Sequence, residues 1–221
     1  MKVLVANRGE IACRVFKTLK RLNIASVAVY TEPDADAPHV WMADESVDLG
    51  DPKAYLDANA ILEAAKETGA TAIHPGYGFL AENSGFAKAC VGAEIVFIGP
   101  SPDAMDAFAD KRSARQLAEK IKVPVIPGAE ACDTVEQATQ IATSIGYPVL
   151  VKAAGGGGGK GMRRVESEDQ LEEAFHSAAR EAKSAFNDER LLLEKYIFPA
   201  RHVEVQMLGD GTDAVVVGDR E

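Results

Sequence analysis

The sequence is poor in cysteine and has no long apolar segment. Its three cysteines, Cys13, Cys90 and Cys132, lie far apart and include no Cys-x-x-Cys pair. This spacing excludes a disulfide framework and the usual zinc sites, so we expect reduced thiols and a reducing, cytoplasmic compartment. No apolar run is long enough to span a bilayer, and Met1-Lys2 leads straight into an apolar strand without a signal-peptide segment. We therefore expect no membrane partner.

Basic side chains are also in the minority. Lys and Arg number 24 against 34 Asp and Glu, which gives a formal net charge of −10 over 221 residues. Such a field repels the phosphates of DNA and RNA, so we expect no nucleic-acid partner. The cations that gather near one segment instead favour a small polyanionic ligand there: Lys152, Lys160, Arg163, Arg164, Lys195, Arg201 and His202.

The most unusual feature that is present is the glycine run 155–159, which lies between a strand pattern at 147–152 and a strand-like segment at 162–165. Consecutive residues without Cβ cost conformational entropy on folding, so the run indicates a close approach to a ligand rather than a linker. Successive amides in a glycine turn bind anions. Lys160 is followed by Gly161 instead of Ser or Thr and no helix starts, which excludes a Walker loop and a dinucleotide loop. We expect a glycine flap that closes over a nucleotide.

The first hundred residues alternate short apolar runs with helical periodicity, which is typical of a parallel α/β unit. They predict a doubly wound domain over residues 1–98, followed by a helical linker over 99–123. Its strands and helices are expected, in chain order, at 2–6, 11–22, 25–30, 46–49, 59–67, 70–74, 83–90 and 94–98.

A smaller α+β module is predicted over 124–196. It contains a helix at 135–145, the flap, a helix whose apolar face includes Leu171 and Phe175, and a returning strand at 191–196. Residues 202–208 and 214–218 read as antiparallel strands joined by Gly209-Asp210-Gly211. We expect this hairpin, within 197–221, to begin a third domain that the chain leaves incomplete.

Two loops follow strands of the predicted parallel sheet. The first is 6–12, with Glu10 near a helix start, and the second is 74–83, with two glycines around Tyr77. The carboxyl ends of parallel strands are where open α/β sheets bind ligands, so both are candidates for a site. For each loop the structural alternative is a tight turn, and for His74 it is an ordinary buried histidine.

These segments together resemble the biotin carboxylase family of ATP-grasp ligases. The matching strings occur in the family's order and cover the whole chain: 5–12, 74–83, 97–100, 110–111, 152–162, 194–197 and 202–206. The resemblance implies a doubly wound N-terminal domain, an ATP-grasp lid and the first hairpin of the C-terminal ATP-grasp domain. It also implies ATP-dependent carboxylation of biotin on a carrier domain, with bicarbonate as substrate, carboxyphosphate as intermediate and Mg²⁺ or Mn²⁺ as cofactor.

The resemblance assigns residues as well. Lys111 and Lys152 reach the nucleotide phosphates, Gly158 and Gly159 cover them, His202 is a further nucleotide contact, and Tyr77 and Gly78 lie near the biotin ring. The hinge against adenine is made by Glu194, Lys195, Tyr196 and Ile197. The family's metal ligands and catalytic residues match nothing in this sequence and are expected beyond residue 221, so we expect the chain alone to be inactive.

The implied partners are the biotinylated carrier domain, a carboxyltransferase subunit or domain, and a second copy in a homodimer or larger complex, as in acyl-CoA carboxylases of fatty acid metabolism and pyruvate carboxylases. The carboxyltransferase decides which acyl-CoA or 2-oxo acid is carboxylated. Alternatives are another ATP-grasp ligase, such as a carbamoyl-phosphate or glycinamide-ribotide type, or a non-catalytic nucleotide-binding or assembly module. Biotin-dependent ATP hydrolysis separates them.

Overall fold

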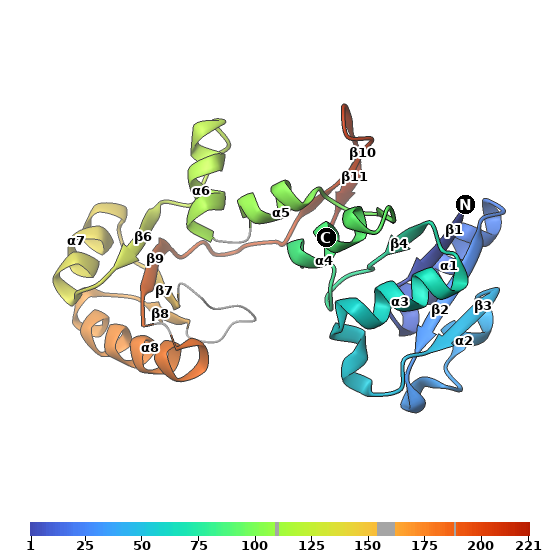
Figure 1. Ribbon diagram of the computed structural model, residues 1–221. Coiled ribbons are helices and arrows are strands. Elements are labelled where there is room, and N and C mark those ends of the chain that lie inside the picture. Colours follow the sequence, from blue (N-terminus) through green and yellow to red (C-terminus); the bar gives the residue numbers. More distant parts are fainter. Residues whose placement is uncertain (109–110, 154–161, 188) are drawn as a thin grey trace. The chain divides into compact units, whose positions relative to one another are not determined.

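The computed structural model describes residues 1–108, 111–153, 162–187 and 189–221. The chain divides into two compact units, Met1–Ala114 and Arg115–Glu221. Each unit has its own sheet and its own hydrophobic core (Figure 1). The finer division at residues 98, 123 and 196 remains a prediction. No helix in the described ranges is long and apolar enough to cross a bilayer.

The first unit contains a five-stranded sheet with the order β3-β2-β1-β4-β5. All of its strand pairs are parallel. The predicted strands are confirmed with small shifts of their ends: β1 (Lys2–Val5), β2 (Ala25–Tyr30), β3 (Glu45–Asp48), β4 (Ala72–His74) and β5 (Val96–Phe97). The order places β1 beside β4, so the chain winds outward in both directions from this pair and the switch point of the fold lies between them.

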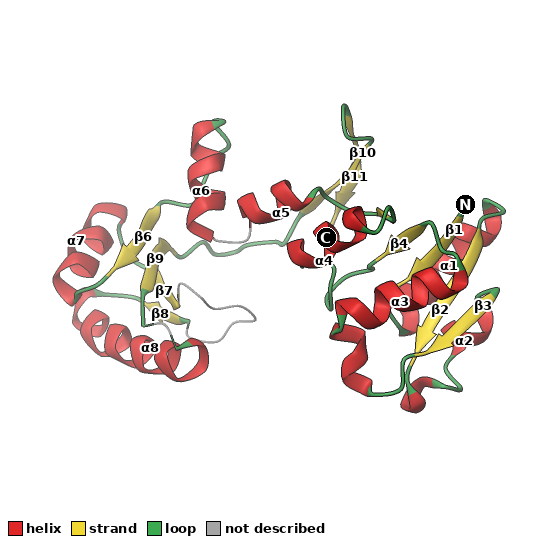
Figure 2. Cartoon of the chain, viewed as in Figure 1, coloured by secondary structure: helices red, strands yellow, loops and turns green. Residues whose placement is uncertain are grey.

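Helices cover both faces of this sheet (Figure 2): α1 (Gly9–Arg21), α2 (Pro38–Met42), α3 (Ala58–Thr68) and α4 (Ser84–Gly92), whereas α5 (Pro102–Phe108) packs against α4. The alternation along β1 explains the two layers. Val3 and Val5 pack with α1 in one core, whereas Leu4 packs with α3 and α4 in the other. Because successive strand residues point to opposite faces, an apolar run without polar positions marks a strand buried on both sides. The doubly wound fold is thereby confirmed.

Local signals fix the ends of the helices. The Asp57 side chain accepts hydrogen bonds from the amides of Asn59 and Ala60 and starts α3, which ends at Gly69 with a positive φ of 65°. The Asn83 side chain accepts from the Phe86 amide at 2.9 Å and starts α4. Such caps satisfy amides that lack partners within the helix. The five-residue α2 was not predicted, because it is too short to show helical periodicity.

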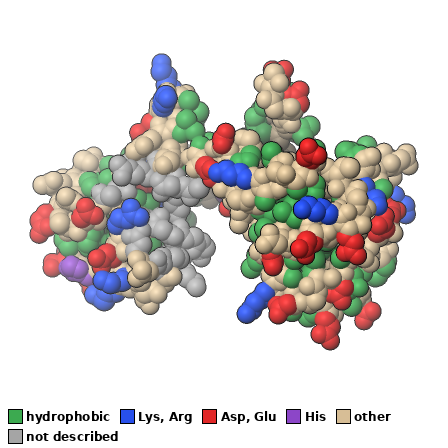
Figure 3. Space-filling model, in the orientation of Figure 1, with side chains coloured by type: hydrophobic (Ala, Val, Ile, Leu, Met, Phe, Trp, Pro, Cys, Tyr) green, Lys and Arg blue, Asp and Glu red, His purple; other side chains and the backbone are tan. Residues whose placement is uncertain are grey.

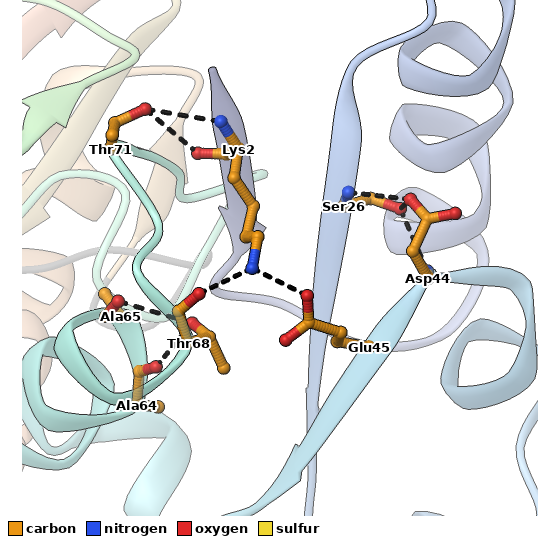
Figure 4. Close-up of polar contacts among 8 residues, drawn as sticks. All are labelled: Lys2, Ser26, Asp44, Glu45, Ala64, Ala65, Thr68 and Thr71. Atoms are coloured by element: carbon orange, nitrogen blue, oxygen red, sulfur yellow. Dashed lines mark hydrogen bonds and ion pairs between the residues drawn. The ribbon is translucent and has the colours of Figure 1, made fainter.

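Polar contacts fasten the amino edge of this sheet (Figure 4). The Lys2 ammonium donates to Glu45 Oε1 and to the Thr68 carbonyl, both at 2.6 Å. Asp44 Oδ2 accepts from the Ser26 amide at 2.8 Å and from its hydroxyl at 2.7 Å, and these hydrogen bonds lower the pKa of Asp44. The contacts join the start of β3 to β1 and to β2 at the edge opposite the strand ends where ligands bind, so we assign them to stability.

The second unit contains a four-stranded antiparallel sheet with the order β6-β9-β7-β8. Its strands are β6 (Gly128–Cys132), β7 (Val149–Ala153), β8 (Arg163–Val165) and β9 (Leu191–Lys195). The helices α7 (Val135–Ile145) and α8 (Leu171–Phe186) pack on one face and form the core with Val149, Val151 and Leu193. A further helix, α6 (Lys111–Lys120), precedes the sheet. The predicted lid fold is confirmed.

The strand β6 was missed by the sequence analysis. Its sequence, Gly128 to Cys132, has almost no β-branched or aromatic residue, so it carries little strand propensity. It is a strand because it pairs with β9, and the pairing is close: a Cβ on Gly128 would lie 2.4 Å from the Leu193 carbonyl oxygen. A glycine is therefore required at this edge for a packing reason that only the paired structure shows.

The predicted hairpin is also present, with β10 (Glu204–Gly209) antiparallel to β11 (Ala214–Arg220). Asp210 Oδ1 accepts hydrogen bonds from the amides of Thr212 and Asp213 and shapes the turn. Both strands expose apolar side chains, including Val205, Met207, Val215, Val216 and Val217.

Candidate functional site

Among the described residues, helices cover only one face of the lid sheet, and we call the other its open face. Along β7, Val149, Val151 and Ala153 are buried against α7 and α8. Leu150 and Lys152 alternate with them and therefore point to the other face. Lys152 lies at the end of β7 that leads into the glycine run, so its ammonium is carried by a regular strand on the open face.

The Lys152 ammonium contacts the carboxylate of Glu194 on β9, the neighbouring strand. The two side chains are 24% and 22% exposed, which makes this a partly buried ion pair. Both residues were predicted to bind a nucleotide, and the structure brings them together. The sequence analysis did not foresee the contact itself. An anion that binds the Lys152 ammonium must displace the Glu194 carboxylate or share the ammonium with it.

Lys195 points the other way. Its ammonium donates to the carbonyl oxygens of Gly146 and Tyr147 at 2.9 and 2.8 Å, so it holds the turn between α7 and β7. The Lys195 and Tyr196 amides donate to the carbonyls of Pro127 and Pro148. Within the described ranges the Ile197 amide, which follows the end of β9, donates no hydrogen bond. A backbone donor at the predicted hinge is therefore left open at position 197.

The cations near the glycine run have acidic partners. Arg163 donates to Glu181 at 2.8 Å, and Arg164 lies 2.5 Å from Glu166 and over the ring of Tyr196 at 4.4 Å. The His202 ring is 81% exposed and lies 3.5 Å from a Glu204 oxygen. The positive cluster expected from the sequence is thus partly neutralised: Glu181 and Glu194 are distant in sequence from their partners, whereas Glu166 and Glu204 lie two residues from theirs.

The nucleotide roles of all the predicted residues stay predictions, and the structure does not describe the side-chain positions of three of them. Gly158 and Gly159, like the rest of the glycine flap and Lys160, lie outside the described residues. Lys111 is the first residue of α6, and the position of its side chain is not described.

In the first unit, the two predicted loops meet at the carboxyl ends of β1 and β4. The Asn7 side chain, which is 4% exposed, donates to the carbonyl oxygens of Pro75 and Tyr77 at 2.9 and 2.8 Å. The Ala6 amide donates to the His74 carbonyl at 2.9 Å. The loops 6–12 and 74–83 therefore form one polar rim at the switch point of the sheet.

Tyr77 and Gly78 lie on this rim. The Tyr77 hydroxyl donates to Glu10 in the first turn of α1, and this hydrogen bond raises the pKa of Tyr77. Gly78 has a positive φ of 65°, and the space where its Cβ would be is open. His74 is a satisfied, partly buried histidine: its Nδ1 accepts from the Gly76 amide at 3.0 Å, and burial lowers its pKa.

A second cluster of side chains contacts the two rim loops through Arg8 and Phe79. The buried Asp34 carboxylate accepts from Arg8 Nε at 2.5 Å and from the Tyr55 hydroxyl at 2.8 Å, and the hydrogen bond from Arg8 lowers the pKa of Asp34. The Tyr55 ring stacks on Phe79 with centroids 5.3 Å apart. Arg8 is thus used in a structural pair. The sequence analysis did not single out Asp34 or Tyr55, since nothing in the sequence links residues 8, 34 and 55.

The three cysteines are free thiols, as predicted. Burial raises the pKa values of Cys90 and Cys132 to about 11, so neither is a reactive thiolate at neutral pH. In the described part of the chain, no group of three or more His, Cys, Asp or Glu side chains is arranged to hold a metal ion.

Acidic side chains are spread over the surface rather than gathered. On the visible face of the first unit, Asp and Glu lie scattered among polar and apolar groups (Figure 3). No acidic or basic patch therefore dominates that face.

Comparison with known proteins agrees with this arrangement. Residues 1–105 match the biotin carboxylase N-terminal domain, and residues 110–221 match the ATP-binding domain of the carbamoyl-phosphate synthase L chain. A parallel-sheet unit followed by this ATP-binding unit places the chain among the ATP-grasp ligases. The chain belongs to the biotin carboxylase family.

Individual relatives are similar over the whole chain. Urea amidolyase of Saccharomyces cerevisiae is 49% identical over 99% of this chain and 12% of its own length. The mitochondrial propionyl-CoA carboxylase alpha chain of Homo sapiens is 49% identical over 95% of this chain and 29% of its own. The biotin carboxylase domain dimer of Hydrogenobacter thermophilus 2-oxoglutarate carboxylase, solved with MgADP, ADP and bicarbonate, superimposes with a TM-score of 0.85 at 46% identity. The chain spans 49% of that domain.

Proposed function

We propose that the second unit binds ATP on the open face of its lid sheet. The observation that carries this proposal is Lys152, a partly buried ammonium at the end of β7 where the chain enters the glycine run. A lysine in this place is a point charge suited to phosphate oxygens. Lys111, Gly158 and Gly159 complete the proposed phosphate contacts, and His202 is a further nucleotide contact.

The adenine base would lie against the hinge 194–197, which consists of the end of β9 and the two residues that follow it. Its edge needs donors and acceptors in one line, and the Ile197 amide is the donor left open there. Glu194, Lys195 and Tyr196 form the rest of this hinge, with the Lys195 side chain serving the fold and not the ligand. This assignment predicts that a proline at position 197 weakens nucleotide binding.

We propose that the rim of the first unit, with Tyr77 and Gly78, receives biotin. The reaction is then ATP-dependent carboxylation of biotin on a carrier domain, with bicarbonate and ATP forming carboxyphosphate. Support comes from the family membership and from the position of the rim at the switch point, where open α/β sheets bind ligands. A bound Mg²⁺ ion neutralises phosphate charge in such reactions, and its ligands are not assigned to the described residues.

The partners follow from the same proposal. They are a biotinylated carrier domain, a carboxyltransferase and, as in the solved relative, a second copy of the domain. The final carboxyl acceptor is left open, because relatives named for urea and for propionyl-CoA are equally identical to this chain. Three free thiols, two of them buried, fit a reducing compartment, and we propose the cytoplasm.

The test uses two proteins: the 221-residue chain, and a hybrid in which the remaining residues of the Hydrogenobacter domain follow Glu221. Each is given ATP, magnesium, bicarbonate and free biotin, and phosphate release is measured with and without biotin. We expect biotin-dependent turnover from the hybrid. Nucleotide binding without turnover in the hybrid would instead support a non-catalytic module, and turnover with ammonia in place of biotin would support a carbamoyl-phosphate type ligase.

A further inference from the structure

The loop that carries Tyr77 and Gly78 has an unusual backbone. Gly76 and Gly78 both have a φ of 65°, and Phe79, which is not a glycine, has a φ of 39°. A bulky residue in the left-handed region is disfavoured and persists only when its surroundings over-determine it. Something outside the loop must therefore hold this conformation.

Asn7 holds the first part of this loop, and the Tyr55 ring stacks on Phe79. The two N–H groups of the Asn7 side-chain amide donate hydrogen bonds to the carbonyl oxygens of Pro75 and Tyr77. Its Oδ1 accepts a hydrogen bond from the Arg8 amide at 2.9 Å. A buried asparagine with this pattern has a single orientation, since a flipped amide would set oxygen against oxygen. One side chain on the β1–α1 loop thus fixes two carbonyls on either side of Gly76.

The fit between the two loops is tight. A Cβ at Gly76 would lie 2.6 Å from Asn7 Nδ2, so position 76 has no room for any side chain while Asn7 is in place. Asn7 and Gly76 therefore pack directly against each other where the loops after β1 and β4 meet.

We propose that Asn7 is a positioning residue for the proposed biotin site, which it serves by clamping the loop 75–79 in its strained conformation. This inference rests on the proposed function for the identity of the ligand, but not for the clamp. Asn7 itself touches no ligand. The Tyr77 hydroxyl stays on Glu10, and Gly78 stays open, only while the clamp holds.

The first experiment measures amide hydrogen exchange by NMR in the 221-residue chain. Asn7→Asp keeps the shape but turns two donors into acceptors that face carbonyl oxygens. We expect the amides of Gly76, Ala81 and Asn83 to exchange at least about tenfold faster, because each donates a hydrogen bond within this loop. The control Asn59→Asp makes the same substitution at an exposed site on α3 and should change none of them.

Asn7→Ala serves as the second variant if the aspartate prevents folding, since it removes the donors without adding charge. Unchanged loop exchange in either folded variant would overturn the clamp.

The second experiment measures steady-state kinetics in the hybrid. With Asn7→Ala we expect kcat/KM for biotin to fall at least about tenfold while KM for ATP changes less than twofold, because the two ligands are proposed to bind different units. Equal losses for both substrates would indicate general destabilisation and overturn the positioning role. If the unmodified hybrid shows no biotin-dependent turnover, the proposed function fails, and the exchange result alone decides whether the clamp exists.

Discussion

Replacing Lys152 by methionine tests the proposed nucleotide site most directly. Methionine keeps the length and apolar stem of the side chain but removes the ammonium. A hydrogen bond between a charged group and a phosphate contributes about 1.5 to 3 kcal/mol, which corresponds to about a 10- to 150-fold loss of affinity. Lys152 is 24% exposed, so solvent screening reduces this energy only in part.

The ion pair with Glu194 increases the expected loss of affinity. In the absence of nucleotide the ammonium is paired with Glu194, and the methionine variant leaves that carboxylate unpaired on the open face. An uncompensated carboxylate repels the phosphates that Lys152 would attract. The loss of nucleotide affinity caused by Lys152→Met should therefore lie toward the upper end of the range of about 10- to 150-fold. Combining it with Glu194→Gln should recover part of the loss, and Glu194→Gln alone should bind nucleotide at least as tightly as the unmodified chain.

Isothermal titration with MgADP measures these affinities in the hybrid protein at low salt. Lys183→Met is the matched control, since Lys183 forms a 66% exposed ion pair with Glu189 on the same unit and should have no effect on binding. Equal affinities for the unmodified protein and Lys152→Met would refute the phosphate role of Lys152. A double variant that binds more weakly than Lys152→Met would show instead that Glu194 itself assists the ligand.

Three further substitutions test the fold around the sites, each by urea unfolding of the chain. Gly128→Ala places a Cβ 2.4 Å from a β9 carbonyl and should destabilise the lid by about 1 to 3 kcal/mol, whereas Gly92→Ala, with open space in α4, should be neutral or stabilising. Asp34→Asn weakens the pair with Arg8 and should cost about 1 to 3 kcal/mol. Burial lowers the pKa of His39 below its ordinary value, so the unfolded chain takes up a proton first and stability should fall as pH drops below about 6.5; His39→Gln should flatten that slope.

The sequence predicted the architecture well where local pattern and tertiary burial agree. Both faces of β1 are covered, and its uninterrupted apolar run shows this directly. The helix at 135–145 was placed correctly because it combines helical periodicity with a capping Thr134. The strand β6 was missed for the opposite reason: its residues have little strand preference, and only pairing with β9 makes them extended.

The site was predicted in its residue types but not in its contacts. Periodicity along β9 could have shown that Glu194 and Lys195 point to opposite faces, because neighbours on a strand always do. It could not show that Glu194 meets Lys152, since that contact depends on the register between β7 and β9. Asn7 is a similar case: its partners are 68 and 70 residues away, and the sequence alone gives no reason to join them.

The paired charges of the lid bear on how an acidic chain binds a polyanion. With a net charge of −10, the protein does not attract phosphate through its overall field. The lysine on the open face is also held by a carboxylate until a ligand arrives. Binding is then an exchange of one anionic partner for another, so a single phosphate gains little. A ligand gains affinity only when several donors act on it together, and this requirement favours a nucleotide that meets Lys152, the hinge and the glycine run at once over free phosphate.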